Sequence, residues 1–368
     1  MFDRRLAYHF DWGLLILTII LGCAGLMTLH SAVSAGAGNA QKALYIKQWI
    51  WFGAGIIVMV ASFAADYKNL KRWAKPIYGF CVGLLVCVML FGRYAGGSKR
   101  WLTFGPVSLQ PSELMKIAVV IILAKYYSDN AKPEGMTLKD LIIPFILTLI
   151  PFALIVKQPD LGTAMTVFLI AASVTLFVKI RWRTFLGLTG TALVLMAPVW
   201  LFALKEYQRQ RILTFLDPDR DPLGTGYHII QSKIAIGSGM MYGKGWMKGS
   251  QNALSFLPEH HTDFIFSVLA EEWGFVGSAS LVVLFLILII YGLNIAYGCK
   301  EPFGTILSVG VTGIIFWQSF INMGMVMGLM PVVGVPLPFI SYGGSSVMSM
   351  MCCIGILMNV SMRRFMFE

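Results

Sequence analysis

The chain has 368 residues and is 57% hydrophobic and 13% charged. With a mean hydropathy of +0.73, this composition excludes a soluble globular domain and predicts a polytopic membrane protein. The formal net charge is +11. Part of this positive charge is typical of basic cytoplasmic loops. The part in the predicted external loop favours an anionic ligand. Nucleic acid is not an expected partner.

Apolar stretches long enough to cross about 30 Å of hydrocarbon recur along the chain, and about ten transmembrane helices are predicted in an all-α fold. Their expected bounds are Trp12 to Val33, Tyr45 to Ala65, Ala74 to Phe91, Pro111 to Ser128, Leu141 to Val156, Leu161 to Val178, Thr184 to Phe202, Val276 to Tyr297, Phe303 to Met330 and Leu337 to Val360. The fifth span is short and holds Pro144 and Pro151, so a kinked or partial crossing is expected.

The orientation follows from the basic residues of the short loops, most of which fall on one side of the predicted spans. The positive-inside rule makes that side cytoplasmic, so both termini are predicted to be cytoplasmic. Residues of about 203–275 then form a large external loop between the seventh and eighth spans. No soluble stretch is long enough for a second domain, and residues 1–368 are predicted to form one integral membrane domain.

The segment GSKRWLTFGPVSLQPSELMK, residues 97–116, leads from an external loop into the fourth span. Glu113 and Lys116 lie one turn apart on one helix face, and such a pair is costly in a membrane unless it lines a cavity. Two interpretations stay open, mutual neutralisation between helices and a functional role. Arg100, beside Trp101, is either an anchor at headgroup level or a ligand-binding cation.

The segment KQPDLGTA, residues 157–164, fills a very short external connection. Asp160 is placed to cap the helix that begins at Leu161, which is the structural interpretation. Lys157 and Gln158 have no such role, and together the three side chains form a candidate ligand-facing cluster.

The long external loop carries three further candidate cations for phosphate, Arg209, Arg211 and Lys244, although the arginines would also suit lipid headgroups. Its alternating aspartates resemble a calcium loop, but Pro222 stands where such a loop needs glycine, so a surface turn is predicted. Short interfacial or re-entrant helices are expected between Pro222 and Met247.

The segment LPEHHTDFIF, residues 257–266, sets Glu259, His260, His261 and Asp263 against an apolar helix. The run from Phe264 to Tyr297 is too long for one crossing, so a partly exposed helix is expected up to Trp273. Asp263 is then either an N-cap or an external catalytic carboxylate. A zinc site is not expected, because adjacent histidines diverge and no His-x-x-x-His spacing is present.

The segment GLMPVVGVPLPFISYGGSSVMSMM, residues 328–351, brackets a short external loop with prolines and glycines before the last span. Ser345 and Ser346 begin that span, and they either cap it or face a ligand.

Six motifs in this order, GSKRW, QPSELMK, KQPDLGTA, GKGW, LPEHHTDFIFSVLAEEWGFVG and PLPFISYGGSS, resemble the SEDS family of bacterial cell-wall polymerases over nearly the whole chain. The GKGW-to-DFIF stretch and the GLMPVVGVPLPF loop are most similar to its elongation members. The resemblance implies a ten-helix peptidoglycan glycosyltransferase of the bacterial inner membrane that polymerises lipid II on the outer face. It places the essential aspartate at Asp263, the paired charges at Glu113 and Lys116, and a hairpin carboxylate at Asp160.

The implied chemistry needs one base for the acceptor hydroxyl and cations for the departing diphosphate, with Arg100, Arg209, Arg211 and Lys244 as candidates. No tightly bound cofactor is expected, although Mg²⁺ or Mn²⁺ could accompany the diphosphate, and Asp263 would then position metal. The expected partners are lipid II, a class B penicillin-binding protein, elongation complex proteins and membrane lipid. The alternatives are a lipid II flippase, which would need polar groups through the membrane depth, and a non-catalytic scaffold.

Overall fold

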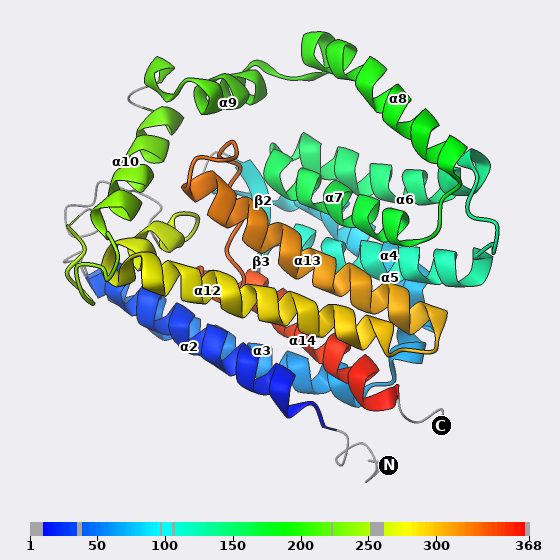
Figure 1. Ribbon diagram of the computed structural model, residues 1–368, viewed down its shortest axis with the longest axis horizontal. Helices are drawn as coiled ribbons and strands as arrows, with labels where there is room; N and C mark the ends of the chain where they lie inside the picture. Colours follow the sequence, from blue (N-terminus) through cyan, green and yellow to red (C-terminus); the bar gives the residue numbers. More distant parts are fainter. Residues whose placement is uncertain are drawn as a thin grey trace.

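The computed structural model describes residues 10–34, 39–95, 98–104, 107–221, 224–250 and 261–364. Ten long helices form the membrane part of the described chain (Figure 1). They are α2 (Trp12–Ser34), α3 (Asn39–Ala64), α4 (Tyr67–Phe91), α5 (Pro111–Asn130), α6 (Leu138–Lys157), α7 (Leu161–Phe177), α8 (Trp182–Pro198), α12 (Ile265–Tyr297), α13 (Pro302–Val326) and α14 (Gly344–Arg363). Each matches one predicted span.

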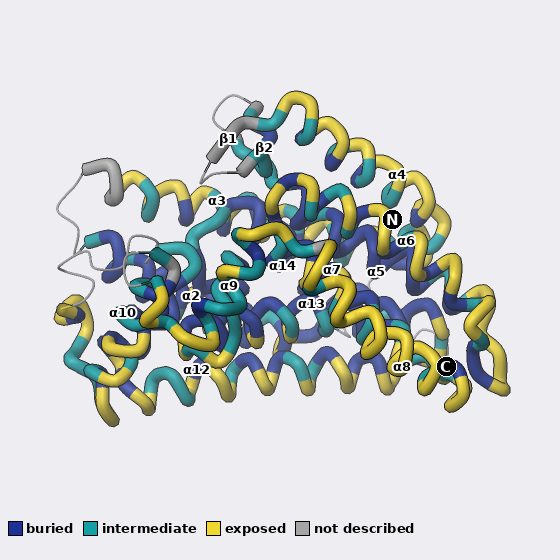
Figure 2. The backbone as a smooth tube through the Cα atoms, turned by 90° about the horizontal axis from the view of Figure 1, so that it is seen from above, coloured by how far each residue is buried: buried dark blue, intermediate teal, exposed yellow. Residues whose placement is uncertain are grey.

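Eight described helices are long and apolar enough to cross a membrane, and the chain is a multi-pass membrane protein. The other two predicted spans are α7, which has 17 residues, and α5, which carries the charged pair. The centre of the bundle is formed by α5, α13 and α14, most of whose residues are buried (Figure 2).

The expectation of a partial fifth crossing is wrong, because α6 is one continuous helix of 20 residues, while the kink at its prolines stays a prediction. A proline in a helix removes the donor for the carbonyl four residues earlier. For Pro151 that carbonyl belongs to Leu147, and it accepts a hydrogen bond from the Tyr78 hydroxyl at 2.8 Å. For Pro144 it belongs to Asp140, and the Tyr126 hydroxyl donates to it at 2.7 Å. Two tyrosines thus replace the donors that the two prolines remove.

The predicted division of the eighth span is confirmed, because α12 breaks at Gly274, whose φ of 66° and ψ of −159° favour glycine. The amides after the break donate to the loop before α12, from Phe275 to the Met240 carbonyl at 2.8 Å and from Val276 to the Met241 carbonyl at 3.1 Å. The first half of α12 is more buried than predicted, since Ile265 to Glu272 are buried and only Trp273 is exposed. The loop backbone at Gly239 and Gly243 covers its last turn, at Ala270 and Glu272.

A small antiparallel sheet precedes α5, and the all-α prediction omitted it. Its strands are β1 (Arg93–Ala95), β2 (Ser98–Phe104) and β3 (Val107–Leu109), in the order β1-β2-β3. Leu102 pairs with Leu109 in the second hairpin. β2 lies against α4 and α5, and β3 lies against α14. Because β3 ends at Leu109 and α5 begins at Pro111, the sheet leads directly into the first turn of α5.

The external loop region carries α9 (Glu206–Leu216), a 3-10 turn (Pro218–Arg220) and α10 (Thr225–Ser238). The expected short helix between Pro222 and Met247 is therefore confirmed as α10, and the predicted surface turn as the 3-10 turn, where Arg220 pairs with Asp217 at 3.1 Å. Figure 1 shows α8, α9 and α10 as an outer arm that leaves the bundle after α7 and returns at the start of α12.

Both ends of the described chain lie at one end of the bundle. Asp11, just before α2, accepts hydrogen bonds from Ser361 of α14 and from the Tyr291 hydroxyl of α12, each at 2.6 Å. An even number of crossings requires this arrangement. The cytoplasmic location of this end stays a prediction.

The two proline sites of α6 give a stability test. Tyr78→Phe leaves the Leu147 carbonyl without its donor inside an apolar helix pair, and we expect a loss of about 1–3 kcal/mol in the free energy of unfolding. Thermal unfolding in detergent measures it. Tyr297→Phe is the matched control, because Tyr297 is 94% exposed and should leave the transition unchanged. Equal melting of both variants would contradict the role given to Tyr78.

Candidate active site

The most buried ion pair of the described residues is that of α5. The Lys116 ammonium lies 2.7 Å from Glu113 Oε1, and the two side chains are only 1% and 2% exposed. Ser349 of α14 donates to Glu113 Oε2 at 3.0 Å. The predicted pairing is confirmed, and the added hydroxyl satisfies the second carboxylate oxygen, as a buried charge requires. Its part in function stays a prediction.

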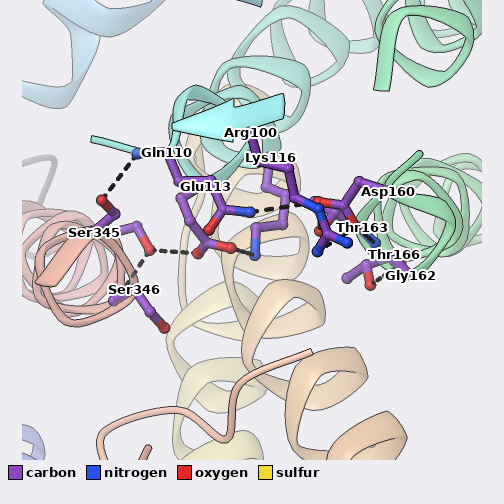
Figure 3. A network of polar contacts seen from close by, with 11 residues as sticks. Arg100, Gln110, Glu113, Lys116, Asp160, Gly162, Thr163, Thr166, Ser345 and Ser346 are labelled. Atoms are coloured by element: carbon purple, nitrogen blue, oxygen red, sulfur yellow. Dashed lines mark hydrogen bonds and ion pairs between the residues drawn. The ribbon is translucent and has the colours of Figure 1, made fainter. Parts of the chain in front are cut away.

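Gln110, immediately before α5, joins three elements at the top of this pair (Figure 3). Its backbone N–H donates to Ser345 Oγ at 3.0 Å, and its side-chain Nε2 donates to Asp160 Oδ2 at 3.4 Å. Ser345 in turn donates to the Ser108 carbonyl at 3.2 Å. The N-cap of α14 is Gly343 and no side chain caps it, so Ser345 links α14 to β3 and α5 instead of capping its own helix.

Asp160 caps α7, as its position predicted. It accepts hydrogen bonds from the Thr163 amide at 3.2 Å and from the Thr163 hydroxyl at 2.9 Å. It also faces Arg100 of β2, whose guanidinium lies 3.7 Å away. The Asp160 side chain is 1% exposed and that of Arg100 is 24% exposed, so the arginine faces the cluster while one edge stays accessible.

Arg211 of α9 brings the outer arm to this cluster. Its guanidinium lies 6.0 Å from the centre of the Tyr207 ring. Burial and the nearby charge of Arg100 lower the pKa of Arg211, while Tyr207, Asp160 and Asp263 raise it. The two arginines and two aspartates therefore share one electrostatic neighbourhood, assembled from β2, α9, α7 and the start of α12.

Asp263 lies in a non-helical segment and is not the N-cap of α12, contrary to one interpretation of the sequence. The N-cap is Phe264, with no side-chain hydrogen bond. The Asp263 carbonyl accepts from Asn322 of α13 at 2.9 Å, and a Cβ placed on Gly334 would lie 3.1 Å from Asp263 Oδ2. Gly334 has a φ of 70°, a conformation that glycine adopts readily, and its lack of a side chain gives the carboxylate room.

The loop that carries Gly334 also reaches α7. A Cβ on Gly162 would collide with the carbonyl oxygen of Val333, the residue before Gly334. Adjacent residues of one loop thus touch the helix start that Asp160 caps and the carboxylate of Asp263. This contact gives a second, steric link between the two aspartates.

The remaining predicted residues lie outside the group formed by Arg100, Asp160, Arg211 and Asp263. Lys157 is exposed at the end of α6, and Gln158 donates to the Leu85 carbonyl of α4 at 2.9 Å. Lys244 pairs with Glu271 at 2.6 Å, and Arg209 donates to the Leu201 carbonyl at 2.7 Å. Ser346 is buried in α14, where its carbonyl accepts from Ser349 at 2.9 Å.

Glu259 and His260 lie outside the described residues. Within the described ranges, no group of three or more His, Cys, Asp or Glu side chains is arranged to hold a metal ion.

Sequence reasoning missed several residues of the site, namely Gln110, Thr163, Asn322, Gly334, Ser341 and Ser349. The clearest available signal was Asn322, because an amide in the middle of an apolar span is costly and needs a specific partner. Thr163 was also detectable, as the third residue after a capping aspartate.

Comparison with known proteins gives one consistent family. The family FTSW_RODA_SPOVE, described as "Cell cycle protein", matches residues 8–365. The chain is 42% identical over 364 residues to the peptidoglycan glycosyltransferase MrdB of Escherichia coli, covering 98% of this chain and 95% of MrdB.

Solved structures agree. One chain, from work on the structural coordination of polymerization and crosslinking by a peptidoglycan synthase complex, matches with a TM-score of 0.82 and 34% identity, over 97% of this chain and 98% of that one. The crystal structure of the Thermus thermophilus rod shape determining protein RodA matches with a TM-score of 0.70 and 28% identity, over 97% of this chain and 98% of RodA.

The buried ion pair gives a second test. Lys116→Met leaves Glu113 charged and unpaired in the core, and we expect a loss of about 3–5 kcal/mol in the free energy of unfolding. Adding Glu113→Gln to the same chain should recover much of that loss, because no uncompensated charge remains. Thermal unfolding of the single and double variants measures both effects. A double variant less stable than Lys116→Met would contradict the pairing.

Proposed function

We propose a function that proceeds from the family, since the chain belongs to the FTSW_RODA_SPOVE family of cell cycle proteins. The protein polymerises lipid II into glycan strands during cell elongation, and Asp263 is the catalytic base. Its enzyme class is peptidoglycan glycosyltransferase, shared with the 42% identical MrdB. The observation that carries the assignment of Asp263 is its shared electrostatic neighbourhood with Arg211, Arg100 and Asp160 at one end of an apolar bundle.

The reaction joins sugars from an α-linked diphosphate donor into a β-1,4 chain, so the anomeric carbon inverts. The acceptor 4-hydroxyl loses its proton to the Asp263 carboxylate as its oxygen bonds to the anomeric carbon. The bond from that carbon to the diphosphate oxygen breaks, and the electron pair leaves with the diphosphate. Fixed guanidinium groups stabilise that developing charge where water is scarce.

The roles of the two aspartates follow from their contacts. Both Asp160 oxygens accept hydrogen bonds from Thr163, and Gln110 also donates to Oδ2, so Asp160 is committed to holding α7, Gln110 and Arg100 in place. Asp263 is the other carboxylate of this neighbourhood, and we assign proton transfer to it. Arg211 and Arg100 are the cations assigned to the diphosphate. A divalent ion, Mg²⁺ or Mn²⁺, would enter with the substrate diphosphate and add charge stabilisation there.

The site is proposed to face the outside of the cytoplasmic membrane, at the bundle end opposite Asp11 and Ser361. Basic residues of the short loops support this orientation through the positive-inside rule. A class B penicillin-binding protein is the proposed partner. The matched peptidoglycan synthase complex, which coordinates polymerization with crosslinking, supports such an assembly. Elongation complex proteins and membrane lipid complete the proposed surroundings.

The primary test is polymerisation of purified lipid II, with and without the transpeptidase-blocked partner. We expect long glycan from the unmodified chain and none from Asp263→Ala, because the acceptor hydroxyl then has no base. Asp219→Ala, which removes an exposed aspartate of the same external region, is the matched control and should remain active. Normal glycan from Asp263→Ala would reject the catalytic assignment. Absence of glycan from every variant, with lipid II crossing vesicles, would favour a flippase.

The diphosphate assignment has its own test. Arg211→Gln should lower kcat/KM for lipid II by about 10²-fold, because one fixed donor to the leaving group is lost. Steady-state polymerisation at several lipid II concentrations measures it. Arg220→Gln is the control, since Arg220 is exposed and pairs with Asp217 on the adjoining turn. Equal effects of the two substitutions would show that general loop charge, not a fixed contact, is what matters.

A further inference from the structure

The segment that carries the proposed base is held by its backbone. Three consecutive carbonyls accept hydrogen bonds from three different donors. The His261 carbonyl accepts from the Tyr342 amide at 3.0 Å, that of Thr262 from Ser341 Oγ at 2.7 Å, and that of Asp263 from Asn322 Nδ2 at 2.9 Å. The segment lies in the turn before the first residue of α12, and these contacts tie it to α13 and to the loop that precedes α14.

Two of the donors are side chains that serve a second carbonyl or amide. Asn322, which is 0% exposed, also donates to the Val335 carbonyl at 2.7 Å. Ser341, which is 2% exposed, accepts from the Leu337 amide at 2.8 Å. Each side chain therefore ties the Asp263 segment to the loop of residues 333–342, which contains Gly334 beside the Asp263 carboxylate.

This loop is itself fixed to the bundle. Gln48 of α3, which is buried, donates to the Ser341 carbonyl and accepts from the Gly343 amide, each at 3.3 Å. A Cβ on Gly25 of α2 would collide with the Phe339 carbonyl oxygen, so the loop also packs directly on α2. The loop is a rigid support whose position is set by α2, α3 and α13.

We infer that Asn322 and Ser341 are positioning residues that aim the Asp263 carboxylate at the acceptor hydroxyl. This inference rests on the proposed function. The direction of the Asp263 side chain depends on the peptide planes on either side of it, and Ser341 and Asn322 each hold one of these planes through its carbonyl. Misplacement of a reacting group by about 1 Å can cost on the order of 10²-fold in rate, so loss of either donor should act on catalysis more than on binding.

The test is the separation of kcat from KM. Asn322→Leu and Ser341→Ala should each lower kcat for lipid II polymerisation by about tenfold or more while KM stays within about twofold. Ser341→Thr keeps the hydroxyl and should retain most of kcat. Ser319→Ala is the matched control, because Ser319 is a buried hydroxyl of the same helix that donates to Ile315 and Phe316 of α13. All rates refer to folded protein, measured by thermal unfolding.

The outcomes separate this inference from the proposed function. A fully active Asp263→Ala variant would overturn the proposed function. Inactive Asp263→Ala together with unchanged kcat in Ser341→Ala and Asn322→Leu would overturn only the positioning role. A fall in kcat that Ser341→Thr does not restore, or that Ser319→Ala matches, would also reject it. Should Asn322→Leu fail to fold, the serine series decides alone.

Discussion

An unpaired backbone carbonyl or amide is costly in an apolar membrane interior, and this constraint organises the polar contacts of the whole bundle. Tyr78 and Tyr126 serve the carbonyls that two prolines expose in α6. At the break of α12, the freed amides reach the carbonyls of the preceding loop. The same requirement shapes the site, where the non-helical segment before α12 is satisfied by donors from α13 and from one loop.

The site therefore combines two kinds of support. Charges are held in pairs and networks, as in Glu113 with Lys116 and in Asp160 with Arg100, so that no buried charge stands alone. Backbone segments are held by amides and hydroxyls, which add no charge near the carboxylate of Asp263. Fixed dipoles and ions of this kind need little rearrangement during a reaction, which suits stabilisation of a departing diphosphate.

The sequence alone predicted the parts that depend on local pattern. Long apolar runs placed all ten long helices, and the excessive length of the run from Phe264 to Tyr297 predicted the division of α12. The small sheet was missed because two of its strands have three residues each, too few to show alternation. Contacts between distant residues were also hidden, since nothing near Lys244 indicates that Glu271 will neutralise it.

Helix α8 has a different relation to its surroundings. Thr184 is its one buried residue, and Figure 2 shows α8 exposed along its length. Its contacts in a membrane are therefore with acyl chains, and with so little packing on the bundle it is free to accommodate a change in bilayer thickness by tilting. A π-helical turn, Val199–Ala203, and the extended residues Leu204 and Lys205 separate α8 from α9, so the helix that faces the lipid and the helix that carries Arg211 are not one rigid rod.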